Sequence, residues 1–145
     1  MALSTAVLMM AGRTAPAADE KSRDAHDAHA AQFDACAKAC YDCSRSCESC
    51  AHHCAHLVAD GKKDHMTTLG TCIDCSGFCI LAGKVVSHRG PMSVLVCESC
   101  AKACDTCAAA CEKFPSDEHM KECAKACRDC AKACREMLKH VEHKQ

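Results

Sequence analysis

The sequence predicts an all-α fold: an antiparallel, up-down-up-down four-helix bundle with a cysteine-lined core. First, eighteen cysteines recur at spacings of three and four residues, which places them on one face of a helix. Second, they form four blocks, so four helices each carry a row of thiols that only the other rows can bury. Third, the chain has no Trp and few aromatic residues, and cysteine can replace them as a small apolar residue. The blocks are Cys36, Cys40, Cys43, Cys47, Cys50 and Cys54; Cys72, Cys75 and Cys79; Cys97, Cys100, Cys104, Cys107 and Cys111; and Cys123, Cys127, Cys130 and Cys134.

Glycine and aspartate delimit the first two helices. The first helix is expected to begin near residue 24 or 26 and to run to about Ala59. Asp60-Gly61 then ends it, because glycine suits the left-handed position past a helix end. Asp64 is expected to cap the second helix, which runs to about Ser87.

Prolines mark the next two boundaries. Gly90-Pro91 breaks the chain, and the proline is expected in the first turn of the third helix, where its missing N–H is tolerated. That helix is expected to end at residue 113 or 114. After Pro115, residues 116–118 supply a cap and an acidic first turn for a fourth helix that runs to about His140. Connections this short imply antiparallel neighbours.

The first 23 residues differ in composition from residues 24–145, which form the expected bundle domain. An apolar run at residues 2–11 is followed by Ala15-Pro16-Ala17-Ala18 and then by charged residues. This order resembles the second half of an export signal with a small-residue cleavage site. We therefore expect a signal-peptide remnant and an exported, periplasmic protein, although the basic front of such a signal is missing. The alternative is a flexible tail on a cytoplasmic protein. The apolar run is too short for a transmembrane helix, so no membrane span is predicted.

Charge and motif content exclude several classes of function. Lys and Arg total 18 and Asp and Glu total 19, for a formal net charge of −1, so the chain lacks the basic footprint of a nucleic-acid-binding protein. The sequence also lacks a phosphate-binding loop, a dinucleotide-binding turn and a nucleophile–base pattern. We therefore expect that nucleic acid is not a partner and that the protein is not an enzyme.

The number and spacing of the thiols indicate metal binding. Val or Leu would bury more surface without the liability to oxidation, so packing alone gives no reason for eighteen cysteines. Six CxxC steps chained by CxxxC steps are instead a strong signal for a soft metal. Four thiolates around zinc leave two negative charges at each site, whereas one monovalent ion per thiolate leaves the core neutral. Because thiolate selects Cu(I) among such ions, the expected cargo is many Cu(I) ions, about one per cysteine.

These features resemble the bacterial copper storage proteins, a family of cysteine-rich four-helix bundles. The resemblance lies in the CxxC and CxxxC alternation on four helices, in His26 and His29, and in the turn Lys113-Phe114-Pro115-Ser116, and it covers roughly residues 24–140. It implies a preformed bundle whose lumen binds Cu(I) through thiolates paired within and between helices. The family has exported members with fewer cysteines and cytosolic members with a count nearer to this one, so the export-like start departs from both patterns.

Histidines and methionines extend the thiol rows at the two ends of the bundle. Where the first helix meets the second and the third meets the fourth, weaker ligands are expected to converge at a mouth that receives copper. These mouth residues are His65, Met66, His119 and Met120. The opposite end is expected to be closed by an apolar plug of Phe33, Val86, Val94 and Val141. His26 and His29 favour the reverse arrangement, because they lie in the first helix's row at the plug end.

Two functions stay open at this point. The leading prediction is storage or sequestration of Cu(I) for buffering, detoxification or supply, with the eighteen cysteines and the four mouth residues as metal ligands. Copper chaperones or copper enzymes are candidate partners. The alternative is a zinc- or cadmium-binding protein or a thiol redox sink. Whether the bundles associate into a homo-oligomer is left open.

Overall fold

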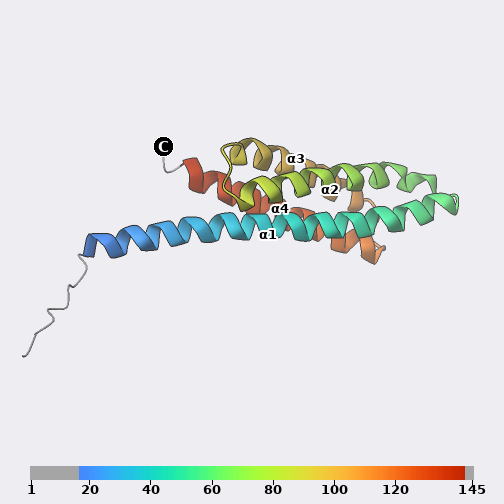
Figure 1. Ribbon diagram of the computed structural model, residues 1–145. Helices are drawn as coiled ribbons and strands as arrows, with labels where there is room; N and C mark the ends of the chain where they lie inside the picture. The colour runs from blue at the N-terminus through green and yellow to red at the C-terminus, as the bar shows by residue number, and fades with distance from the viewer. Residues whose placement is uncertain (1–16, 143–145) are drawn as a thin grey trace, which may run out of the picture.

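The computed structural model describes residues 17–142 of the chain and the side chains of residues 28–141. Over this range the elements are α1 (Ala17–Ala59), a short 3-10 helix η1 (Lys63–His65), α2 (Met66–Ser87), α3 (Ser93–Cys111) and α4 (Glu118–Glu142). Helices α1 and α3 each pack against both α2 and α4, so the four helices alternate in direction around one axis (Figure 1). This confirms the predicted antiparallel four-helix bundle. The apolar run at residues 2–11 and the side chain of His26 lie outside the described residues.

Helix α1 is much longer than its partners. It has 43 residues, whereas α2, α3 and α4 have 22, 19 and 25, and its first turns extend past the other three helices (Figure 1). It begins at Ala17, so the predicted start at residue 24 or 26 was wrong. Ala, Glu, Lys and Arg are frequent between residues 17 and 25 and have high helix propensity, which favours the earlier start of the helix.

The turn between α1 and α2 contains the predicted left-handed glycine. Gly61 has φ 89°, and the N–H of Lys62 donates to the Leu57 carbonyl at 2.9 Å, as in a Schellman helix end. Asp64, however, does not cap α2. It lies within η1, and the residue before α2 is His65, which makes no side-chain capping hydrogen bond. The predicted cap was wrong because a turn of 3-10 helix stands between Gly61 and α2.

The turn between α2 and α3 is longer than expected. Arg89 adopts a left-handed φ of 54°, and the Ser93 hydroxyl donates to the Gly90 carbonyl at 2.6 Å. Helix α3 begins only at Ser93, so Pro91 lies in the turn rather than in the first turn of the helix, and that prediction was wrong. The proline lies two residues before the helix and does not enter it.

The turn between α3 and α4 agrees with the predicted cap. Helix α3 ends at Cys111, a little before the expected residue 113 or 114. The N–H of Met120 donates to Oδ1 of Asp117 at 3.3 Å, so the predicted acidic cap is present at the start of α4. Helix α4 then continues to Glu142, two residues past the expected His140.

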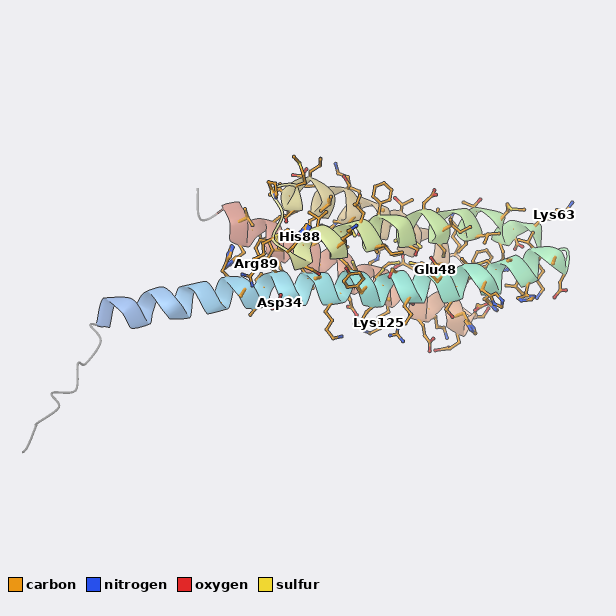
Figure 2. The ribbon with its side chains drawn as sticks, viewed as in Figure 1. Asp34, Glu48, Lys63, His88, Arg89 and Lys125 are labelled. Atoms are coloured by element: carbon orange, nitrogen blue, oxygen red, sulfur yellow. The ribbon has the colours of Figure 1, made fainter. Side chains whose placement is uncertain are left out.

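All eighteen thiols face the core. Each cysteine is at most 1% exposed, and buried alanines such as Ala108 and Ala131 fill the spaces between the rows. Charged side chains, including Asp34 and Lys125 in Figure 2, lie on the outer faces. There Arg128 of α4 donates to Glu112 at 3.0 Å, which joins α4 to the end of α3. The predicted cysteine-lined core is therefore confirmed.

Helix α2 carries apolar residues on its outer face as well. Ile73, Phe78 and Leu81 are exposed there. Among the described helices, the segment 63–87 is long and apolar enough to cross a membrane by length and composition. Its three cysteines nevertheless lie in the bundle core, so we interpret it as a core helix of the bundle.

Candidate metal centre

The thiols form one continuous column along the bundle. In each of five groups of four cysteines, all sulfur atoms lie within 4.8 Å of one another. These five, which are not the only groups, are Cys40, Cys100, Cys130 and Cys134; Cys43, Cys79, Cys104 and Cys130; Cys43, Cys47, Cys75 and Cys127; Cys47, Cys107, Cys123 and Cys127; and Cys50, Cys72, Cys111 and Cys123. Successive groups share members, as Cys130 does for the first two and Cys123 for the last two. A metal ion in one group would therefore use ligands that also belong to the next.

Helices α1 and α2 meet in the predicted register. Cys43 shares a group with Cys79, Cys47 with Cys75, and Cys50 with Cys72. This pairing follows from antiparallel packing on either side of the turn between the two helices. The group that contains Cys50 and Cys72 also takes one cysteine from α3 and one from α4, so a single layer of the column joins all four helices.

The spacing of the sulfur atoms suits coordination by three or four thiolates. Neighbouring sulfur atoms lie as close as 3.6 Å, as for Cys47 and Cys127, and all sulfur atoms of one group lie within 4.8 Å of one another. Metal–sulfur bonds of about 2.3 Å place the sulfur atoms about 3.8 Å apart around a tetrahedral ion and about 4.0 Å apart around a trigonal ion. A linear ion between two sulfur atoms would need about 4.6 Å. That separation also lies within the 4.8 Å limit that holds for each group.

No Lys or Arg side chain lies in the described part of the core to neutralise thiolates. The buried polar or charged residues there are Ser44, His65, Thr68, Ser76 and Ser93. Burial, and secondarily the nearby Cys50, raises the pKa of Cys54 to about 12. At pH 7 this thiol is neutral, and it must lose its proton when a metal ion binds.

Hydrogen bonds between thiols shift the pKa values of different core cysteines in opposite directions. Hydrogen bonds from Cys104 and Cys127 lower the pKa of Cys43, whereas those with Cys100 and Cys104 raise the pKa of Cys79. A thiolate is stabilised where neutral neighbours donate to it, and its neighbours then hold their protons more firmly.

At one end of the column, formed by the α1–α2 and α3–α4 turns, Met120 touches the thiols. Its side chain is fully buried, and the Cys50 thiol donates to its sulfur at 3.5 Å. His65 is also buried, and its ring stacks on Phe114 with centroids 4.0 Å apart. Among the described residues, Nδ1 of His65 has no hydrogen-bond partner. Buried polar atoms are nearly always paired, so this nitrogen is an exception among the described residues.

The other two predicted mouth residues lie on the surface. Met66 is exposed, and so is His119, which stacks on His53 with ring centroids 4.4 Å apart. Nε2 of His53 lies 2.8 Å from Oδ2 of Asp117. The structure therefore brings His65 and Met120 inside but leaves Met66 and His119 outside. Sequence reasoning missed His53, because it lies off the thiol row of α1 and meets Asp117 only in the folded bundle.

The opposite end is closed by apolar side chains, as predicted, but with a change of members. Val86 and Met137 are fully buried and Phe33 is 5% exposed. Val94 is exposed, so its predicted place in the plug was wrong. The thiol row of α3 is continued by the buried Ser93, four residues before Cys97, and not by Val94, three residues before it. Val141, the remaining predicted member, is half-buried.

Histidine is also present at the plug end. Nδ1 of His29 lies 2.8 Å from Nε2 of His140. The ring centroid of His29 lies 4.8 Å from that of Phe33. The contact ties α1 to α4 beside the plug. His29 is thus engaged across the bundle rather than directed along the thiol row.

A comparison with known families identifies this cysteine-lined bundle. The sequence model described as copper storage protein matches residues 29–139, which include every cysteine. The chain belongs to the copper storage protein family. This confirms the resemblance inferred from the cysteine spacing. It is a storage family rather than an enzyme family.

Solved structures of copper storage proteins have the same fold. Apo copper storage protein 3 from Bacillus subtilis is 33% identical, with a TM-score of 0.62, and the match covers 72% of this chain and 96% of that one. A Cu(I)-bound copper storage protein, BsCsp3, is 30% identical, with a TM-score of 0.63 and coverage of 74% and 98%. The cytosolic copper storage protein of Streptomyces lividans, solved with five coppers, is 29% identical, with a TM-score of 0.69 and coverage of 78% and 97%. None of the curated proteins matches this chain.

Proposed function

We propose that the protein stores Cu(I) in its thiol column, at about one ion per cysteine. The observation that carries this proposal is the unbroken run of buried thiols that share neighbours from one layer to the next. Membership of the copper storage family and the similarity to a Cu(I)-bound relative support it. The ions would be held by thiolates alone over most of the column, and each ion would displace protons from the thiols that bind it.

The charge of the core favours Cu(I) over zinc. Each zinc ion held by four thiolates would leave two negative charges in a core whose described part contains no buried Lys or Arg. Zinc would also need groups with no shared member, whereas successive groups along the column share cysteines. Cu(I) avoids both problems, because one ion per thiolate is neutral and adjacent ions can share sulfur atoms.

Zinc or cadmium binding is the second candidate function, and the sulfur spacing gives it some support. Separations of 3.6–4.0 Å suit a tetrahedral ion as well as a trigonal one. The experiment is to load the reduced protein with Cu(I) and with Zn(II) in separate anaerobic titrations against an affinity competitor. We expect a Cu(I) count near the cysteine count and only a few tightly held zinc ions. A zinc count as high as the copper count would contradict the storage proposal.

We also propose that copper enters at the end of the bundle defined by the four mouth residues. The support is the buried, unpaired Nδ1 of His65 and the contact between Met120 and the Cys50 thiol. Imidazole and thioether bind Cu(I) less tightly than thiolate does, so they can receive an ion and release it inward. Met66 and His119, being exposed, would act only as first contacts from solution.

For location, we propose the cytoplasm. The Streptomyces lividans relative is described as cytosolic, which supports the alternative reading of the first residues rather than export. Helix α1 begins at Ala17, so residues 17–23 belong to the same helix as the first cysteines. Fractionation of cells that produce the full chain tests this: the protein should appear with cytoplasmic markers, and recovery in the periplasm with a shortened N-terminus would contradict it.

A homo-oligomer is proposed through the outer face of α2. Ile73, Phe78 and Leu81 are exposed on this face, and burying their apolar surface is favourable. Light scattering of the reduced protein should give a mass above that of one chain, and Ile73→Lys with Phe78→Lys should return it to the monomer. Copper chaperones or copper enzymes are the proposed donors and acceptors.

A further inference from the structure

Two histidines outside the thiol column face each other on the surface of α1. His52 and His56 are exposed and stand one helical turn apart. Their Nε2 atoms lie 3.3 Å apart, although the ring centroids are 4.5 Å apart and the rings are nearly perpendicular, at 73°. The two nitrogens are thus the near edges of the pair, within hydrogen-bonding distance of each other on two exposed residues.

We propose that His52 and His56 form a separate site for a divalent first-row metal ion, with Zn(II) as its representative. Zinc–imidazole bonds of about 2.0–2.1 Å at a tetrahedral angle place the two nitrogens about 3.3–3.4 Å apart. The observed 3.3 Å matches this separation without any movement of the helix. Two histidines four residues apart on a helix are also a known arrangement for zinc ligation.

The same distance does not suit Cu(I) held between two imidazoles. A linear ion with bonds of similar length would need about 4 Å between the nitrogens. Imidazole is a neutral ligand, so a divalent ion here keeps its positive charge, which water can solvate at this exposed position. Each of the two places therefore suits a different ion: the buried thiolates suit a monovalent soft ion, and the exposed imidazoles suit a divalent one.

The neighbouring acidic groups leave the site open rather than closed. Glu48, four residues before His52, accepts the Ser76 hydroxyl at 2.5 Å and is held toward α2. His53 is engaged with Asp117. Asp60 stands four residues after His56 and is exposed. Water would complete the coordination, and an ion held in this way exchanges with solution.

The experiment must separate this site from the thiols, which also bind zinc. The reduced protein is first filled with Cu(I) and its copper content measured, so that a failure of copper storage is seen before zinc is added. Zn(II) is then titrated anaerobically and followed by calorimetry and by NMR of the imidazole rings. We expect one zinc ion per chain, with shifts in the rings of His52 and His56 and no loss of copper.

Variants assign the site. His52→Ala and His56→Ala should each weaken zinc binding by about tenfold or more. His88→Ala is the matched control, because His88 is an exposed histidine at the end of α2 away from Lys63 (Figure 2), and it should bind zinc as the unmodified protein does. Helix content measured by circular dichroism checks that each variant is folded. Absence of zinc binding, or equal binding in all three variants, would overturn the proposal.

Discussion

The thiol of Cys50 donates a hydrogen bond to the sulfur of Met120 at 3.5 Å, which joins residues 70 positions apart in the sequence. This contact lies near the end of the thiol column, one helical turn before Cys54, and Cys50 belongs to the layer with Cys72, Cys111 and Cys123. Asp117 caps the N–H of Met120, so the thioether is fixed at the first turn of α4. A copper ion bound to Met120 would have a thiolate of the column as its next ligand.

Met120→Leu tests whether the thioether passes copper to the column. Leucine has nearly the same volume, so we expect a loss of less than about 1.5 kcal/mol in the free energy of unfolding. Stopped-flow measurements should show slower Cu(I) uptake, with the final copper count nearly unchanged. The matched control is Met137→Leu, since Met137 is equally buried at the plug end. Equal slowing in the two variants would contradict the assignment of the mouth.

His65→Phe separates a ligand role from a packing role. The Phe ring can keep the stack on Phe114, while the buried, unpaired Nδ1 is removed. We expect the apo protein to gain about 1 kcal/mol in the free energy of unfolding, and copper uptake to become slower. The control is His53→Phe, which loses the contact with Asp117 and should lower stability. If His65→Phe took up copper at the normal rate, His65 would be a structural residue only.

The thiol rows could be predicted from sequence because their spacing is a local property of a helix. Every cysteine predicted to face the core does so. Local spacing does not decide which residue continues a row beyond its last cysteine, because the positions three and four residues away both fit. Ser93 and Val94 stand four and three residues before Cys97, and both fit the row; the helix places Ser93 inside and Val94 outside. Hydropathy alone would have chosen the valine.

Contacts between helix ends could not be predicted in the same way. The pairing of His53 with Asp117 joins residues 64 positions apart and depends on how α1 is aligned with the α3–α4 turn. The extra turn η1 likewise buries His65 and leaves the next residue, Met66, exposed. Capping and turn residues indicate where a helix ends, but they do not give the rotation of the first turn, which decides which of two adjacent residues faces the core.

The shared layers predict that copper sites are lost together. Cys47 and Cys75 belong to one group with Cys43 and Cys127, so Cys47→Ser and Cys75→Ser should each disturb the same ions. We expect the copper deficit of the double variant to be smaller than the sum of the two single deficits. The control pairs Cys47→Ser with Cys36→Ser, because Cys36 contacts Cys97 and Cys134 at the far end, and those deficits should add. Simple addition in both pairs would mean that sites are independent.

The caps and short connections predict that the bundle is folded before copper binds. Gly61 ends α1 and Asp117 caps the start of α4. A buried core of neutral thiols also needs no metal to pack. Circular dichroism of the reduced, metal-free protein should show a largely helical spectrum that changes little when Cu(I) is added. A spectrum that becomes helical only with copper would rule out a preformed column, as in small zinc domains that fold on metal binding.

The pH dependence of stability should differ between the empty and the filled protein. Burial first, and then the nearby Cys50, raises the pKa of Cys54 from 9.0 to about 12. In the unfolded chain this thiol ionises near pH 9, so between pH 9 and 12 the unfolded state binds fewer protons than the folded state. The stability of the apo protein is therefore complete below pH 9 and falls as the pH rises through this window. The filled protein should lack this fall, because its thiols have already lost their protons to copper.

Chemical denaturation across the window measures both slopes, and Cys54→Ser should make the apo slope shallower because a hydroxyl does not ionise there. An apo protein whose stability rose with pH over this range would show that its buried thiols are ionised before copper binds.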